Sequence, residues 1–101
     1  METTAPLAHV SADLADLVPR YLQNRRTDLN FARQLLRDGD FYLLAGLAHR
    51  IQGSASSYGF ATIGDIAREV EKAAEQRDGM AIESHLRALE RFLDSVEVTY
   101  V

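Results

Sequence analysis

The sequence contains no cysteine, and its only prolines are Pro6 and Pro19. Without cysteine the chain has no disulfide bond, no thiolate metal site and no thiol chemistry, so zinc-finger functions are excluded and a reducing cytoplasm suits the protein. Proline interrupts helices and sheets, and here both prolines lie near the start. The rest of the chain is therefore open to regular structure.

A long hydrophobic run and an excess of positive charge are also missing. The longest apolar stretch, residues 41–48 with Gly46 inside it, is far shorter than the roughly 20 residues that span a bilayer. The first ten residues lack the basic and apolar segments of a signal peptide. Acidic residues outnumber Lys and Arg by 15 to 11, whereas nucleic-acid surfaces gather Lys and Arg. We expect a cytoplasmic protein without a nucleic-acid or membrane partner.

The length and composition are those of one ordinary globular domain. A chain of 101 residues, 47% hydrophobic and 26% charged, can bury one core but leaves little room for a second. Internal repeats and low-complexity tracts are absent from the sequence. We predict a single domain over residues 1–101, acting as a monomer, with residues 1–10 as a loose N-terminus.

Apolar residues recur at intervals of three and four, and no stretch shows the alternation of a half-buried strand. Short turns are predicted at Asp38-Gly39-Asp40, Gly59 and Asp78-Gly79, where glycine can close one helix and aspartate can cap the next. Helices joined by such turns lie antiparallel. The predicted fold class is all-α, an up-down-up-down antiparallel four-helix bundle with a short N-terminal helix. The helices are predicted at residues 11–18, 19–37, 41–58, 62–76 and 80–98.

His49 points away from the apolar side of the helix predicted at residues 41–58. On a helical wheel at about 100° per residue, that buried side comprises Leu44, Leu47, Ala48, Ile51, Ala55 and Tyr58. The neighbours of His49 on its own face are small or neutral: Ala45, Gly46, Gln52, Gly53 and Ser56.

Gly46 and Gly53 flank His49, one helical turn before it and one turn after it. Each glycine inside a helix costs about 1 kcal/mol relative to alanine. The physical gain is access, because another protein's backbone and carboxylate can then approach a ring nitrogen. The alternative interpretation is an ordinary surface histidine, with glycines that permit close helix packing.

The run Ala48–Gly59, AHRIQGSASSYG, resembles the signature of histidine-containing phosphotransfer domains. In that family the histidine is followed by one glycine four residues on and by another at ten, and Gly53 and Gly59 fill those places. The resemblance extends from the Pro19 helix to the last helix and includes the acidic helix end at Glu69 and Glu71. It favours a specialised His49 over an ordinary surface residue.

The resemblance implies a phosphoryl carrier, not an enzyme. Such a protein accepts a phosphoryl group on His49 from a receiver-domain aspartate and passes it to another in a two-component phosphorelay. Its partners are receiver domains of response regulators and a hybrid sensor kinase. The receiver supplies the magnesium ion and the acidic pocket, so this chain needs no metal or cofactor of its own. Residues expected to dock the receiver are Gly46, Arg50, Gly53 and Ser56.

Imidazole suits this role because its neutral ring carries a nucleophilic nitrogen near physiological pH. One position departs from the family pattern, which commonly has lysine three residues after the histidine, where this chain has Gln52. We expect Gln52 to support the phosphoryl group, although an amide cannot offset its charge. This departure is the best support for the alternative function, a helical-bundle adaptor that binds a receiver domain or another signalling partner without being phosphorylated.

An autonomous histidine kinase is not expected, because the sequence shows no glycine-rich phosphate loop and 101 residues leave no room for an ATP-binding domain. The remaining ionisable residues are predicted to be solvated surface. This group includes His9, His85, Asp65, Glu69, Glu71 and Glu75, none of which comes with metal-ligand spacing. Three arginines form either a basic patch for an acidic partner or, as the favoured interpretation, a solvated helix face: Arg25, Arg26 and Arg33.

Overall fold

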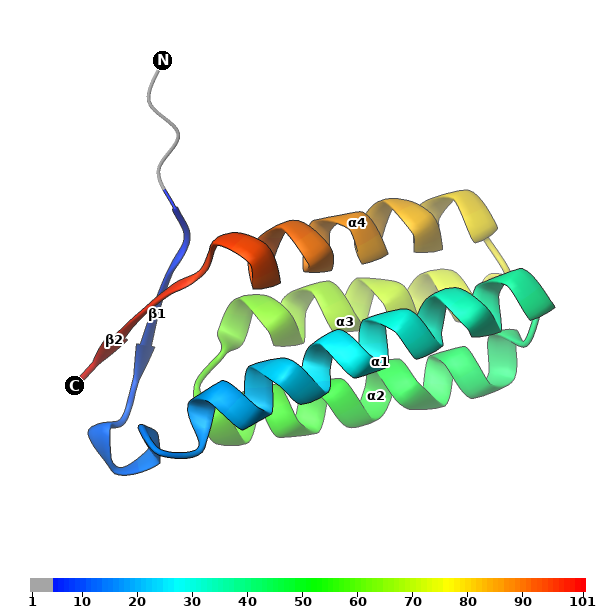
Figure 1. Ribbon diagram of the computed structural model, residues 1–101. Coiled ribbons are helices and arrows are strands. Elements are labelled where there is room, and N and C mark those ends of the chain that lie inside the picture. Colours follow the sequence, from blue (N-terminus) through cyan, green and yellow to red (C-terminus); the bar gives the residue numbers. More distant parts are fainter. Residues whose placement is uncertain (1–4) are drawn as a thin grey trace, which may run out of the picture.

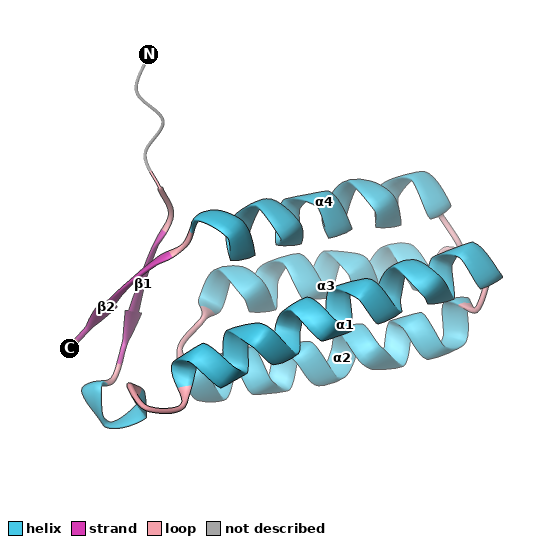
Figure 2. Cartoon of the chain, in the orientation of Figure 1, coloured by secondary structure: helices cyan, strands magenta, loops and turns pink. Residues whose placement is uncertain are grey.

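The computed structural model describes residues 5–101, and four α-helices form most of this part of the chain. The helices lie side by side, and consecutive helices run in opposite directions (Figure 1). Figure 2 shows two short strands beyond one end of the helical bundle. The predicted four-helix arrangement is confirmed. Its helices are α1 (Val18–Asp38), α2 (Phe41–Tyr58), α3 (Ala61–Glu75) and α4 (Gly79–Ser95).

The ends of α2 lie where the sequence predicted them. Oδ1 of Asp40 accepts a hydrogen bond from the backbone N–H of Leu43 at 3.1 Å, which caps the helix N-terminus. Gly39 and Gly59 close α1 and α2 with φ angles of 70° and 81°, a left-handed conformation that glycine adopts without steric cost. These local signals fix the helix that carries His49.

The loose N-terminus predicted over residues 1–10 is wrong for residues 7–10, while residues 1–4 lie outside the described part of the chain. Strand β1 (Leu7–Val10) pairs in parallel with β2 (Glu97–Tyr100). Ala8 and Val10 are only 7% and 1% exposed, so β1 covers the end of the core. The last helix consequently ends at Ser95, not at residue 98 as predicted.

The short helix predicted over residues 11–18 is also wrong. A single 3-10 turn forms at Ala12–Leu14, where Oγ of Ser11 accepts from the backbone N–H of Asp13 at 3.3 Å. The backbone N–H of Ala12 donates to the carbonyl of Val101 at 3.0 Å. The segment is thus tied to the end of the C-terminal strand, and it forms one 3-10 turn in place of an α-helix.

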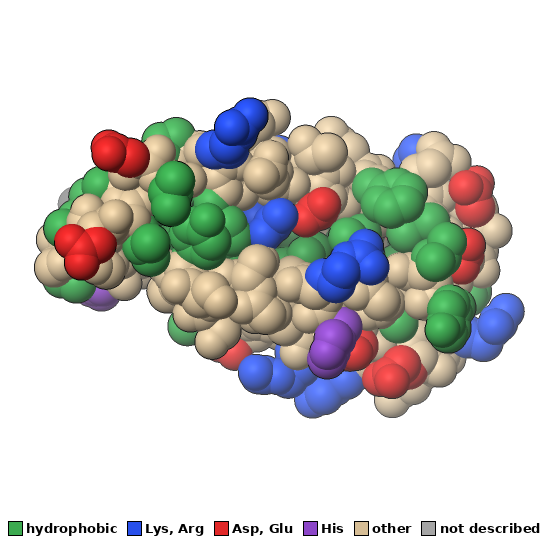
Figure 3. Space-filling view, turned by 90° about the horizontal axis from the view of Figure 1, so that it is seen from below, with side chains coloured by type: hydrophobic (Ala, Val, Ile, Leu, Met, Phe, Trp, Pro, Cys, Tyr) green, Lys and Arg blue, Asp and Glu red, His purple; other side chains and the backbone are tan. Residues whose placement is uncertain are grey.

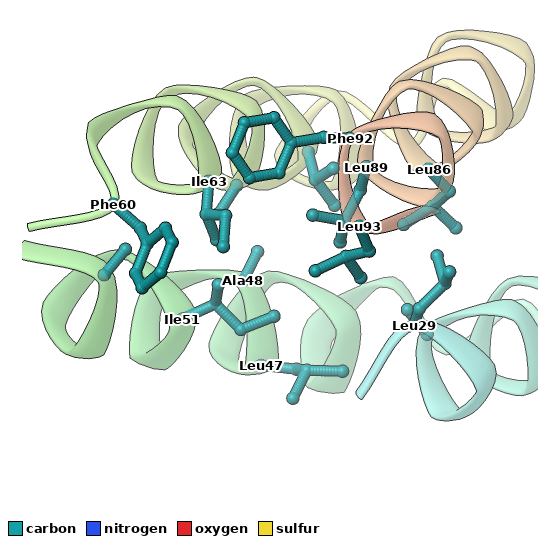
Figure 4. Packing of buried hydrophobic residues seen from close by; sticks show 14 of the residues in the cluster. Leu29, Leu47, Ala48, Ile51, Phe60, Ile63, Leu86, Leu89, Phe92 and Leu93 are labelled. Carbon is teal, nitrogen blue, oxygen red and sulfur yellow. The ribbon is translucent and has the colours of Figure 1, made fainter. Parts of the chain in front are cut away.

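The hydrophobic core lies between the four helices and beneath the sheet. Figure 4 shows side chains from all four helices directed into one interior, including Leu29, Ile51, Ile63 and Leu89. Each of these is at most 5% exposed, and burying such a side chain contributes about 1.5–3 kcal/mol. Within residues 5–101 no polar or charged residue is buried. The polar residues of α2 therefore stay at its surface.

Small and aromatic residues hold α2 close to its neighbours. A Cβ at Gly64 of α3 would lie 3.6 Å from the Cβ of Ala55 of α2, which is ordinary van der Waals contact. Near the sheet, the Tyr21 ring stacks on Tyr58 with centroids 4.3 Å apart and on Phe60 at 5.4 Å. The approach of Gly64 to Ala55 sets the spacing of α2 and α3, whose facing side chains build the candidate site, and the Tyr21 stack ties the end of α2 to α1.

Candidate functional site

His49 stands on the outer face of α2, with 73% of its side chain exposed. Gly46 and Gly53 flank it by one turn on either side. Among the described residues, no atom apart from the adjoining helix backbone lies within 4 Å of a Cβ placed at either glycine. Neither glycine serves close helix packing, so that part of the alternative interpretation is excluded. The glycines leave open space around the imidazole.

A carboxylate on the neighbouring helix holds one side of the imidazole. Nδ1 of His49 lies 3.1 Å from Oε2 of Glu71, whose side chain is only 24% exposed. An ionised carboxylate can only accept a hydrogen bond, so Nδ1 is the nitrogen that carries the proton in this contact. The lone pair of the neutral ring is then on Nε2. The contact thus leaves Nε2 as the ring nitrogen that could act as a nucleophile.

Glu71 was predicted to lie on a solvated helix face, and that prediction is wrong. It follows the buried Val70 on α3 and lies at the edge of the surface that packs on α2. Two signals in the sequence could have found it: this position beside the buried side of α3, and the acidic helix end included in the family resemblance. Periodicity alone could not pair it with a residue on another helix.

Gln52 is engaged with the same carboxylate. Its Nε2 donates a hydrogen bond to Oε1 of Glu71 at 2.6 Å. Each oxygen of Glu71 thus has a different partner, His49 on one side and Gln52 on the other. The amide restrains the rotation of the carboxylate. Its expected contact with a phosphoryl group stays a prediction.

An open hollow of about 770 Å³ lies beside His49. Its lining includes Phe31 of α1, Tyr42 and Leu43 of α2, and two cations, Arg50 and Arg77. The three apolar side chains are 48%, 88% and 51% exposed, and grouped exposed apolar residues mark interaction surfaces. Figure 3 shows this face with a histidine beside an acidic side chain and hydrophobic side chains toward both ends.

The other predicted site residues are also on this side of α2. Ser56 is exposed and follows Gly53 by one turn, and Arg50 is exposed and lines the hollow. His9 lies on β1 and His85 on α4. The structure therefore brings Gly46, Arg50, Gln52, Gly53 and Ser56 together around His49.

The arginines considered as a basic patch are paired with carboxylates. Arg25 lies 3.0 Å from Asp28, Arg26 lies 2.7 Å from Asp94, and Arg33 lies 3.1 Å from Glu90. The last two pairs join α1 to α4. These contacts are structural, so the arginines do not form an unpaired basic surface.

Two further findings concern residues 5–101. Histidine, aspartate and glutamate side chains do not gather there in groups of three or more that could hold a metal ion. No helix in this part of the chain has the length and apolar character needed to cross a bilayer.

Among curated proteins and solved structures, none matches the chain. The family model described as the Hpt domain matches residues 16–99. The match includes all four helices and most of β2. Hpt domains have phosphotransfer roles in two-component phosphorelays and interact with receiver domains. The match covers nearly the whole chain, and the protein belongs to the Hpt domain family.

Proposed function

We propose that this protein accepts a phosphoryl group on Nε2 of His49 from the aspartyl phosphate of one receiver domain and passes it to the aspartate of another. The observation that carries this proposal is the exposed imidazole whose Nδ1 is held at 3.1 Å by Glu71. The glycines on either side give a partner access to the free nitrogen. The protein acts as a carrier, without a nucleotide site of its own.

In the proposed step the lone pair of Nε2 attacks phosphorus. The new P–N bond forms as the P–O bond to the aspartate breaks, and the electrons of the broken bond stay on the aspartate carboxylate. His49 keeps its Nδ1 proton, so the phosphorylated ring is cationic and Glu71 faces that charge. Transfer onward is the reverse reaction with a second receiver. Such transfer depends mainly on positioning and charge stabilisation.

The docking surface is proposed to combine the cleared face of α2 with the hollow next to it. Gly46, Gly53 and Ser56 let the receiver's acidic pocket reach the imidazole. Exposed Phe31 and Tyr42 would be covered by the same partner. The proposed transfer uses the imidazole of His49, the carboxylate of Glu71 and the docking surface of this chain. The magnesium ion is therefore expected on the receiver.

A phosphotransfer panel against the receiver domains of the source organism tests this function. Each receiver is first phosphorylated by a small phosphodonor such as phosphoramidate and then mixed with this protein. We expect acid-labile, base-stable label on His49 from at least one receiver. Absence of label from every receiver and from phosphoramidate itself would contradict the proposal.

A second candidate is the unphosphorylated adaptor. The observation that favours it is the neutral Gln52, whose amide is already occupied by Glu71, in place of the lysine common in the family. An adaptor would bind a receiver in a calorimetric titration, yet His49 would stay unlabelled in the panel. Binding with labelling supports the carrier, whereas binding without labelling supports the adaptor.

A further inference from the structure

Arg77 has an unusual backbone conformation between α3 and α4. Its φ is 56°, and among residues 5–101 it is the one non-glycine residue with positive φ. The corresponding residue after α1 and after α2 is glycine. A side chain at this position is disfavoured by contact of its Cβ with the backbone. Glycine would end the helix at a lower conformational cost than arginine. The arginine side chain must therefore have a role besides ending the helix.

The side chain of Arg77 lies at the rim of the hollow that contains His49. Its guanidinium carbon is 4.9 Å from the centre of the Phe41 ring, a cation–π contact. Within residues 5–101 no carboxylate forms an ion pair with it. The aromatic ring therefore holds a charged, planar donor that is available to a partner.

The guanidinium of Arg77, held against Phe41, is displaced along α2 from the imidazole of His49. Phe41 and His49 are eight residues apart on α2, which corresponds to roughly 12 Å along the helix axis. Arg50, a second cation, and Glu75, a carboxylate, also line the hollow. A partner seated over His49 would cover the rim as well, so Arg77 would meet the partner's surface outside its phosphoryl pocket.

We infer that Arg77 is a specificity-determining residue: its guanidinium pairs with a carboxylate on the rim of the docked receiver domain. This inference rests on the proposed function. Arginine presents two parallel N–H donors to a carboxylate, and a partner that places a carboxylate there docks more readily than one that does not. The backbone strain is retained because the side chain serves docking.

The test compares Arg77→Gly and Arg77→Gln with the wild type, using the receiver that transfers fastest in the panel. Arg77→Gly relieves the strained conformation, so the melting temperature of this variant should rise by about 2–6 °C. Arg77→Gln keeps the strain. For both variants KM for the phosphorylated receiver should rise about tenfold with kcat unchanged, and the difference should shrink in 0.5 M NaCl. Arg20→Gln, an exposed cation on α1 outside the hollow, should leave KM unchanged.

Direct labelling by phosphoramidate separates the two proposals, because it needs no docking surface. All variants should be labelled by phosphoramidate at the wild-type rate. Unchanged KM in both Arg77 variants, or a loss confined to kcat, would overturn the role of Arg77 and leave the carrier function standing. A wild-type protein that no donor labels would overturn both. Lower thermal stability of Arg77→Gly would also overturn the inference, since the side chain would then be structural.

Discussion

Nδ1 of His49 and Oε2 of Glu71 lie 3.1 Å apart, although 22 residues separate them in the chain. The contact joins α2 to α3 at the surface of the bundle, and Gln52 restrains the carboxylate from its other side at 2.6 Å. The three side chains form a small polar unit on two packed helices. Packing of α2 against α3 therefore sets the orientation of the imidazole as well as the stability of the fold.

The first prediction concerns the acceptor. His49→Gln should leave helicity and melting temperature nearly unchanged, because an exposed side chain contributes little to stability. Labelling by a phosphorylated receiver should be abolished, as measured by phosphate incorporation after acid and base treatment. The matched variants His9→Gln and His85→Gln should be labelled like the wild type. If His49→Gln still becomes labelled, then another residue is the phosphoryl acceptor.

The second prediction concerns the carboxylate that faces the imidazole. Glu71→Ala should slow labelling of His49 by phosphoramidate about tenfold, which corresponds to the roughly 1.4 kcal/mol of one charge-assisted hydrogen bond. Glu71→Gln should show a smaller loss, because its carbonyl oxygen can still accept from Nδ1. Gln52→Ala removes only the hydrogen bond that restrains Glu71, so its labelling rate should lie closer to that of the wild type.

Nitrogen NMR of the imidazole gives an independent measurement of the same contact. In the wild type the neutral ring should carry its proton mainly on Nδ1, and Glu71→Ala should shift the population toward the Nε2-protonated form. An unchanged tautomer ratio together with an unchanged labelling rate would show that Glu71 does not orient the nucleophile.

The elements that the sequence predicted well have their signals close together in the chain. For α2, the capping Asp40 and the closing Gly59 stand directly at its ends, and the apolar spacing between them marks the buried side. The exposure of His49 followed from the same spacing. Such features depend on contacts within a few residues, which a single sequence displays.

The missed elements depend on contacts between distant residues. Strand β1 pairs with β2 about 90 residues away, with Leu7 aligned on Glu97, and four residues are too few to show a clear alternation. The helical spacing of Val96 continued that of α4 and concealed the start of β2. Glu71 was missed for the same reason, because its partner lies on another helix.

The third prediction concerns the pH dependence of stability. A hydrogen bond from Arg33, assisted by the charge of its guanidinium, lowers the pKa of Glu90 below its ordinary value of 4.5. The folded state thus binds fewer protons than the unfolded state at acidic pH, so the contribution is present above pH 4.5 and is lost as pH falls through the lowered pKa. Glu90→Gln should show a shallower loss of unfolding free energy between pH 5 and pH 3.

Urea unfolding at several pH values measures this slope. Arg33→Met is the matched variant, because it returns the pKa of Glu90 toward its ordinary value and should flatten the acid limb in the same way. The guanidinium of Arg33 adds no pH dependence between pH 3 and pH 5. Its pKa already lies far above that range, and the hydrogen bond to Glu90 raises the pKa further. A wild-type slope in both variants would contradict the prediction.

The last prediction tests whether the space beside His49 serves docking. A Cβ at Gly53 would meet no atom of the described residues within 4 Å apart from the adjoining helix backbone, so Gly53→Ala should raise the free energy of unfolding by about 0.5–1 kcal/mol. Gly53→Glu should also fold, but it places a carboxylate where the receiver's acidic pocket is proposed to dock. Transfer from a phosphorylated receiver should fall slightly for alanine and severely for glutamate, through steric overlap and like-charge repulsion.

Phosphoramidate again provides the comparison, because it is small enough to reach the imidazole in either variant. Direct labelling at the wild-type rate, combined with impaired transfer from the receiver, assigns the loss to docking. The same pair of substitutions at Gly46, whose Cβ position is equally open within residues 5–101, should repeat the pattern on the other side of His49. If Gly53→Ala destabilises the bundle, or if Gly53→Glu accepts phosphoryl groups from the receiver normally, then this face of α2 is not the docking surface.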